Sequence, residues 1–104
     1  MENNQILARL DPATSQAQVE FAERELAAAG RTLDETRVRL TEARRQLTRT
    51  EKLREQALVS ETALDTARAD VEALAARLNA QEAQRKVAAS GLALRRQDLA
   101  DLEI

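Results

Sequence analysis

Residues 26–47, LAAAGRTLDETRVRLTEARRQL, carry a leucine at every seventh position: Leu26, Leu33, Leu40 and Leu47. Val19 extends this series by one repeat toward the N-terminus. A seven-residue apolar repeat keeps its side chains on one helix face only if that helix winds around a partner helix. The stretch therefore predicts one arm of a coiled coil.

The leucine series fails at Arg54 and then resumes as a second apolar series: Leu64, Val71, Leu78, Leu92 and Leu99. The interruption divides the chain into two arms of similar length, so the second arm can serve as the partner of the first. The pattern predicts an all-α fold, a long antiparallel two-helix coiled-coil hairpin. Arm one is expected at about 12–56, the tip at about 55–60 and arm two at about 61–100.

The composition favours helices over any other element. The 104 residues are 33% charged and 43% hydrophobic with 1% aromatic content, and the hydrophobic share is mostly Ala and Leu. These two residues are strong helix formers, whereas strands favour β-branched and aromatic residues. Such a composition with a period near seven is typical of a coiled coil.

Two short stretches predict where the arms begin. Asp11 is expected to be the N-cap of arm one, with Pro12 at the first helical position, where its missing N–H costs nothing. Ser60 is expected to cap arm two, and Glu61 is placed to interact favourably with the helix dipole.

The predicted contact seam alternates large and small side chains. A small residue follows each large residue of arm one by three positions: Ala22, Ala29, Thr36, Ala43 and Thr50. Arm two is less regular, because Arg85 falls in its leucine series and Gln81 and Arg95 fall in the companion series. We therefore expect the half of the hairpin far from the tip to be less well sealed, with polar residues there setting register or facing a neighbouring subunit.

The charge pattern and residue types argue against several functions. The 16 basic and 18 acidic residues give a net charge of −2 and are interleaved along the chain. The sequence therefore shows no basic face of the kind that binds nucleic acid. With no Cys or His, and no convergent acid, base or nucleophile, we expect no metal site, no cofactor and no enzyme activity. Apolar runs are too short to span a membrane, and the first residues lack a signal-peptide pattern. If the native protein is exported, this chain is expected to be part of a longer parent.

At the predicted tip, residues 49–60 read RTEKLREQALVS. This stretch resembles the tip motif of bacterial periplasmic adaptor proteins, also called membrane fusion proteins or the HlyD family. That motif is an Arg, a Leu four residues later and a Ser seven residues after the Leu, here Arg49, Leu53 and Ser60. Many members carry Gly shortly before the Ser, whereas this chain has Ala57.

The resemblance extends to both ends of the chain. Residues 5–14, QILARLDPAT, are similar to the exit from the first lipoyl half-motif of the family, and residues 99–104, LADLEI, resemble the re-entry into the second half. The resemblance implies a remnant of the first lipoyl half-motif at 1–10, a hairpin at 11–100, and the start of the second half-motif at 101–104.

For function, the resemblance implies a hairpin that bridges an inner-membrane transporter to a TolC-like outer-membrane channel for efflux or secretion. The parent would be anchored to the inner membrane, lie in the periplasm and form a hexameric ring, with transporter contacts in domains outside these residues. Arg49, Leu53 and Ser60 would contact the channel tip.

Residue chemistry alone leaves simpler roles open. Arg49 could be a solvated base, Leu53 a seam residue and Ser60 only a helix cap, although Leu53 lies one residue before its position in the leucine series and could point outward. The alternative function is a generic structural coiled coil of a scaffold or filament protein, for example a parallel dimer whose helix runs straight through residues 56–60.

Overall fold

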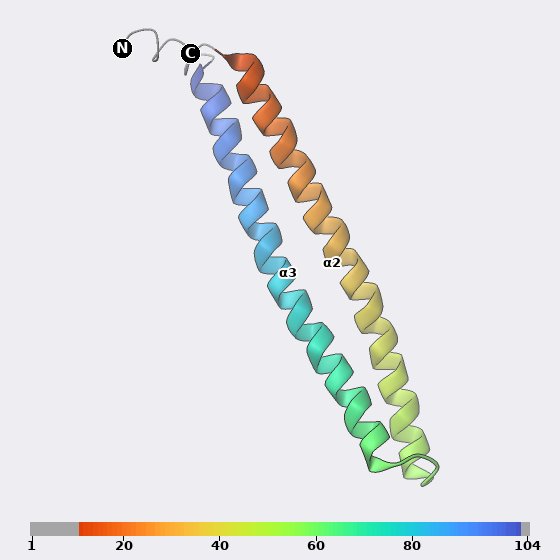
Figure 1. The fold of residues 1–104 in the computed structure, drawn as a ribbon. Helices are drawn as coiled ribbons and strands as arrows, with labels where there is room; N and C mark the ends of the chain where they lie inside the picture. The colour runs from red at the N-terminus through yellow and green to blue at the C-terminus, as the bar shows by residue number, and fades with distance from the viewer. Residues whose placement is uncertain (1–10, 103–104) are drawn as a thin grey trace. The chain divides into compact units, whose positions relative to one another are not determined.

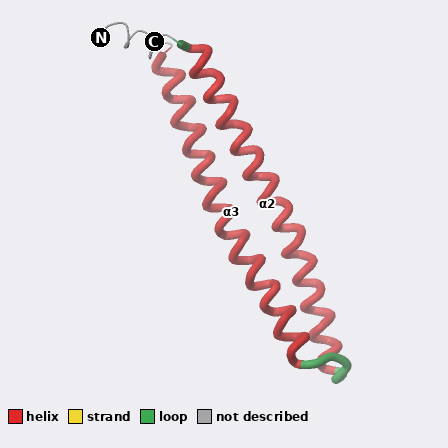
Figure 2. The backbone as a smooth tube through the Cα atoms, viewed as in Figure 1, coloured by secondary structure: helices red, strands yellow, loops and turns green. Residues whose placement is uncertain are grey.

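A computed structural model describes residues 11–102, and in this range the chain is all α. The described residues form two helices, α2 (Pro12–Glu55) and α3 (Glu61–Leu102), and no strand. A turn at residues 56–60 joins them (Figures 1 and 2). The predicted two-helix hairpin is confirmed, and the helix does not run straight through residues 56–60.

The segments predicted at the two ends of the chain lie partly outside this range. Residues 1–10, expected to be a lipoyl remnant, and residues 103 and 104 are not among the described residues. Helix α3 continues to Leu102, so Asp101 and Leu102 are helical, two residues beyond the expected end of arm two.

Helix α2 begins at the predicted cap. The Asp11 carboxylate accepts hydrogen bonds from the Thr14 backbone N–H (3.0 Å) and from the Thr14 hydroxyl. The Asp11 carbonyl accepts the first helical bond, from the Ser15 N–H (3.1 Å). Asp11 thus satisfies donors that a helix start leaves unpaired, while Pro12 has no N–H to satisfy.

The helices pack within two compact units, each of which pairs a segment of α2 with a segment of α3. The tip unit comprises residues 31–83 and contains the turn, and the base unit comprises the described parts of residues 1–30 and 84–104. In each unit the two segments lie side by side and run antiparallel (Figure 1). Ion pairs join the segments, Arg37 to Glu82 (3.6 Å) in the tip unit and Arg96 to Glu23 (3.1 Å) in the base unit.

The tip unit holds most of the buried side chains of the described residues. Its buried apolar residues are Leu33, Leu40, Leu64 and Ala67, joined by Thr36 and Thr50. The Thr50 hydroxyl donates to the Gln46 carbonyl one turn earlier (2.8 Å), so its burial leaves no unpaired donor. Gln81 is different, because its buried Oε1 has no hydrogen-bond partner within residues 11–102.

The base unit has a thinner core, in which only Ala22 and Leu92 are buried among its described residues. Arg85, at a predicted seam position, is half-buried, and Arg95 is exposed. This agrees with the expectation that the half far from the tip is less well sealed. On arm one, by contrast, all ten predicted seam residues from Val19 to Thr50 are buried or half-buried.

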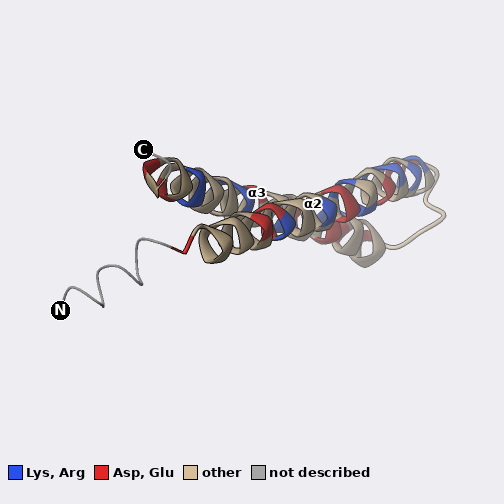
Figure 3. Ribbon diagram, turned by 90° about the horizontal axis from the view of Figure 1, so that it is seen from above, with Lys and Arg blue, Asp and Glu red and all other residues tan. Residues whose placement is uncertain are grey.

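Charged residues cover the remaining faces of both helices, with basic and acidic positions interleaved along each one (Figure 3). Several form ion pairs one turn apart, among them Asp34 with Arg37, and Glu35 with Arg39. Pairs of this kind are exposed and each contributes well under about 1 kcal/mol. These residues keep the outer faces of the helices polar and contribute little to the packing of α2 against α3.

Candidate docking site at the hairpin turn

The turn is built on a pair of backbone hydrogen bonds that close the end of α2. The Leu58 N–H donates to the Leu53 carbonyl (N to O 2.8 Å), and the Ala57 N–H donates to the Arg54 carbonyl (2.9 Å). Ala57 has a φ of 57° and lies in the left-handed region. Together these features form a Schellman motif, a helix ending in which the left-handed position is usually glycine.

Ala57, where many members of the HlyD family carry Gly, is therefore the residue of the turn that adopts the left-handed conformation. Glycine reaches this conformation without steric cost, whereas the Cβ of alanine approaches the following carbonyl. The chain nevertheless makes the turn with alanine.

A side-chain hydrogen bond from Arg54 also stabilises the turn. The Arg54 Nη1 donates to the Val59 carbonyl across the turn (3.2 Å). Arg54 is also the position at which the leucine series fails, so the residue that interrupts the seam is the one that closes the loop after it.

Helix α3 begins at the predicted cap, Ser60. Its hydroxyl oxygen accepts the Ala63 backbone N–H (3.0 Å), and its carbonyl accepts the Leu64 N–H (3.3 Å). Val59, directly before the cap, is half-buried and Leu64 is buried. These are the two positions at which apolar residues commonly pack together and fix the angle at which the chain enters a helix.

Two leucines at the turn are exposed. The side chain of Leu53 is 39% exposed and that of Leu58 is 65% exposed. Leu53 is thus turned partly away from the seam, as its early position in the leucine series suggests. In a Schellman motif, residues at these two positions often contact one another. The turn therefore offers a small apolar surface to the outside.

Arg49 lies one helical turn before Leu53. Its Nη2 donates to the Gln46 Oε1 (3.1 Å) and to the Glu42 Oε1 (3.3 Å). Both partners precede it on α2, so the guanidinium is directed away from the turn. The side chain remains 58% exposed, and it can exchange these surface partners for others at small cost.

The surface around Arg49 is basic. Arg49 lines a shallow depression with Arg44, Arg45 and two threonines. Glu42 pairs with both Arg45 (3.8 Å) and Arg49 (3.3 Å), so one carboxylate offsets two guanidinium groups. The exposed guanidinium of Arg49 can therefore bond to a carboxylate or carbonyl group of a partner.

The structure thus brings the three predicted residues to the end of the tip unit in different states. Arg49 and Leu53 lie four residues apart on α2 and both are exposed. Ser60 lies across the turn, with its oxygen already engaged in capping. Its cap role is confirmed, while the contact roles of all three remain predictions.

Two turn residues were not among the predicted site residues. Leu58 is more exposed than Leu53, and Arg54 holds the loop. A signal for both was present in the sequence. Arg54 stands in place of a seam leucine and is followed by five residues and then the Ser60 cap, which leaves Leu58 in the segment between the two described helices.

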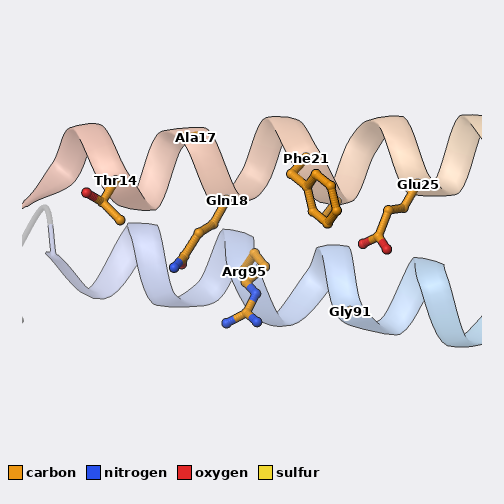
Figure 4. Close-up of a pocket in the computed structure, with 8 residues that line it drawn as sticks. Thr14, Ala17, Gln18, Phe21, Glu25, Gly91 and Arg95 are labelled. Carbon is orange, nitrogen blue, oxygen red and sulfur yellow. The ribbon is translucent and has the colours of Figure 1, made fainter.

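A second hollow lies in the base unit. It is lined from α2 by residues including Thr14, Gln18, Phe21 and Glu25, and from α3 by Gly91 and Arg95 (Figure 4). The Phe21 side chain is 64% exposed, and a Cβ added at Gly91 would meet nothing within 4 Å. The hollow is open, and its lining mixes apolar, acidic and basic groups without defining one ligand.

The remaining chemistry of the described residues is limited. They include no cluster of three or more acidic side chains placed to hold a metal ion. Neither helix, over the part that the structure describes, contains a stretch both apolar and long enough to cross a membrane.

Comparison with protein-family models, with curated proteins and with solved structures found no match to this chain.

Proposed function

We propose that this chain is the α-helical hairpin of a periplasmic adaptor of the HlyD type, and that its turn docks on a TolC-like outer-membrane channel. One observation supports this above the others. The residues of the adaptor-like motif, Arg49, Leu53 and Ser60, flank the turn between α2 and α3, where apolar side chains are exposed.

Each residue would supply a different interaction. Arg49 would exchange its contacts with Glu42 and Gln46 for a charge-assisted hydrogen bond to a carbonyl or carboxylate of the channel. Leu53 would bury an apolar side chain worth up to about 2 kcal/mol. Ser60 would keep the approach close, because it is small and its hydroxyl already lies against the start of α3.

A single turn of this size binds weakly. In the proposed parent, six hairpins in a ring would present six such turns at once, and linked contacts bind far more tightly than any one of them. The role is that of a bridge between an inner-membrane transporter and the channel, located in the periplasm, and it involves no catalysis.

The test uses the full-length parent protein with one substitution at a time: Arg49→Asp, Leu53→Ser or Ser60→Arg. Each variant is expected to lower dye efflux and co-purification of the channel at least tenfold, because each loss is repeated in all six turns. Helicity and ring assembly should stay near normal, since all three residues are exposed and the loss of the Ser60 cap costs only about 1 kcal/mol.

Arg45→Asp is the matched control. Arg45 also pairs with Glu42, so this variant removes a comparable surface contact one turn further from the tip. Its export should stay within about twofold of the unchanged protein. Full export by all three tip variants would instead favour a generic structural coiled coil.

A further inference from the structure

Among the described residues, Arg54 behaves unlike the other exposed arginines that follow an acidic residue by three positions. Arg37, Arg45 and Arg68 each pair with that acidic residue: Asp34 at 3.3 Å, Glu42 at 3.8 Å and Asp65 at 3.9 Å respectively. Arg54 has Glu51 at the same spacing and shares a small hollow with it. Its guanidinium is nevertheless bonded to the Val59 carbonyl.

The bond joins the two ends of the turn. Arg54 lies in the last turn of α2, and Val59 directly precedes the cap of α3. The Arg54 carbonyl also accepts the Ala57 N–H, so one residue holds the turn through both its main chain and its side chain. A cation in the last helical turn also interacts favourably with the helix dipole.

The hydrogen bond from Arg54 matters for the turn because Ala57 has a left-handed backbone conformation. A left-handed backbone is populated less readily by alanine than by glycine, so the backbone bonds alone hold this ending less firmly than in a glycine-ended helix. Leu58 lies between Ala57 and Val59 in the chain. The backbone conformations of these two neighbours therefore determine the position of the exposed Leu58 side chain.

We infer that Arg54 is a positioning residue, whose guanidinium holds the turn in the conformation that presents Leu58. Its effect on docking rests on the proposed function, while its effect on the turn does not. Arg54 itself need not touch the channel.

Two measurements test this on the full 104-residue chain. The first is hydrogen exchange of the Leu58 amide, followed by NMR. The second is binding of a purified TolC trimer to chains immobilised at high density. Arg54→Ala should speed Leu58 exchange about fivefold, the factor expected when one ordinary hydrogen bond is lost. The same variant should weaken binding at least fivefold.

The variant Arg54→Ala with Ala57→Gly provides the decisive comparison. Glycine removes the cost of the left-handed backbone, so exchange and binding should both return to within about twofold of the unchanged chain. Arg39→Ala, which truncates another exposed arginine of α2 that lies outside the depression around Arg49, should change neither.

Unchanged Leu58 exchange in Arg54→Ala would refute the inference. So would a double variant in which exchange recovers but binding does not, because Arg54 would then contact the channel directly. If the unchanged chain does not bind TolC but Leu58 exchange responds as expected, the proposed function fails and the role of Arg54 in the turn stands.

Discussion

At the scale of single residues, Ala57 has a backbone conformation that is unfavourable for its residue type. We expect Ala57→Gly to raise the free energy of unfolding by about 1 kcal/mol, because glycine adopts a φ of 57° without steric penalty. Denaturant unfolding followed by circular dichroism measures this. The same exchange at Ala69, exposed in the interior of α3, should lower stability by about 1 kcal/mol, since glycine weakens a helix interior. Equal signs at the two positions would contradict the assigned turn conformation.

Gln81 is a second residue with an identifiable cost. Its buried Oε1 has no hydrogen-bond partner among the described residues, and an unsatisfied buried acceptor costs about 1–3 kcal/mol. Gln81→Leu should therefore raise the free energy of unfolding by about 1–2 kcal/mol, because a seam leucine needs no partner. Gln84→Leu, at an exposed position, serves as the control and should change stability by less than about 0.5 kcal/mol. A destabilised Gln81→Leu chain would show that this amide is needed in the seam.

At the scale of the element, we expect the start of α2 to be sensitive to pH. Hydrogen bonds from the Thr14 hydroxyl and then from its backbone N–H lower the pKa of Asp11 below 3.8. A carboxylate with a lowered pKa stabilises the folded state above its unfolded pKa, and this contribution is lost as the pH falls through the lower value. As the pH falls from 5 to 2, hydrogen exchange of the Thr14 amide should therefore become faster, after correction for the intrinsic exchange rates. In Asp11→Asn, whose amide caps without titrating, this change should be absent.

The elements were the part of the structure that the sequence predicted best. The heptad series, the Asp11-Pro12 start and the Ser60 cap are local signals, and the helices begin where these signals indicated. The turn was less predictable, because its conformation depends on hydrogen bonds of Arg54 that cross it. No residue of the turn requires a bend, since it contains neither Gly nor Pro. The proposed docking residues were predicted from the resemblance of residues 49–60 to the adaptor tip motif and from their place at the break in the leucine series, and neither shows that Arg49 would bond to Gln46.

At the scale of the whole molecule, the seam of the tip unit is expected to control stability. Leu40 is 3% exposed, so Leu40→Asp buries a charge without a partner and removes an apolar side chain. We expect a loss of at least about 3 kcal/mol, measured as loss of helicity in thermal and denaturant unfolding. Val38→Asp places the same side chain two residues earlier at a position 70% exposed, and should cost less than about 1 kcal/mol. Similar losses from the two variants would rule out the assigned seam.

The division of the chain into a tip unit and a base unit has a kinetic consequence. The two segments of the tip unit adjoin the turn, whereas those of the base unit are separated along the chain by all of residues 31–83. Closing a long loop costs more entropy than closing a short one, so the first productive encounter of the arms favours the segments beside the turn. Base contacts such as Arg96 with Glu23 would then form after the rate-limiting step. We therefore expect substitutions near residues 56–60 to change the refolding rate, and substitutions at base contacts mainly to change how quickly the folded chain opens.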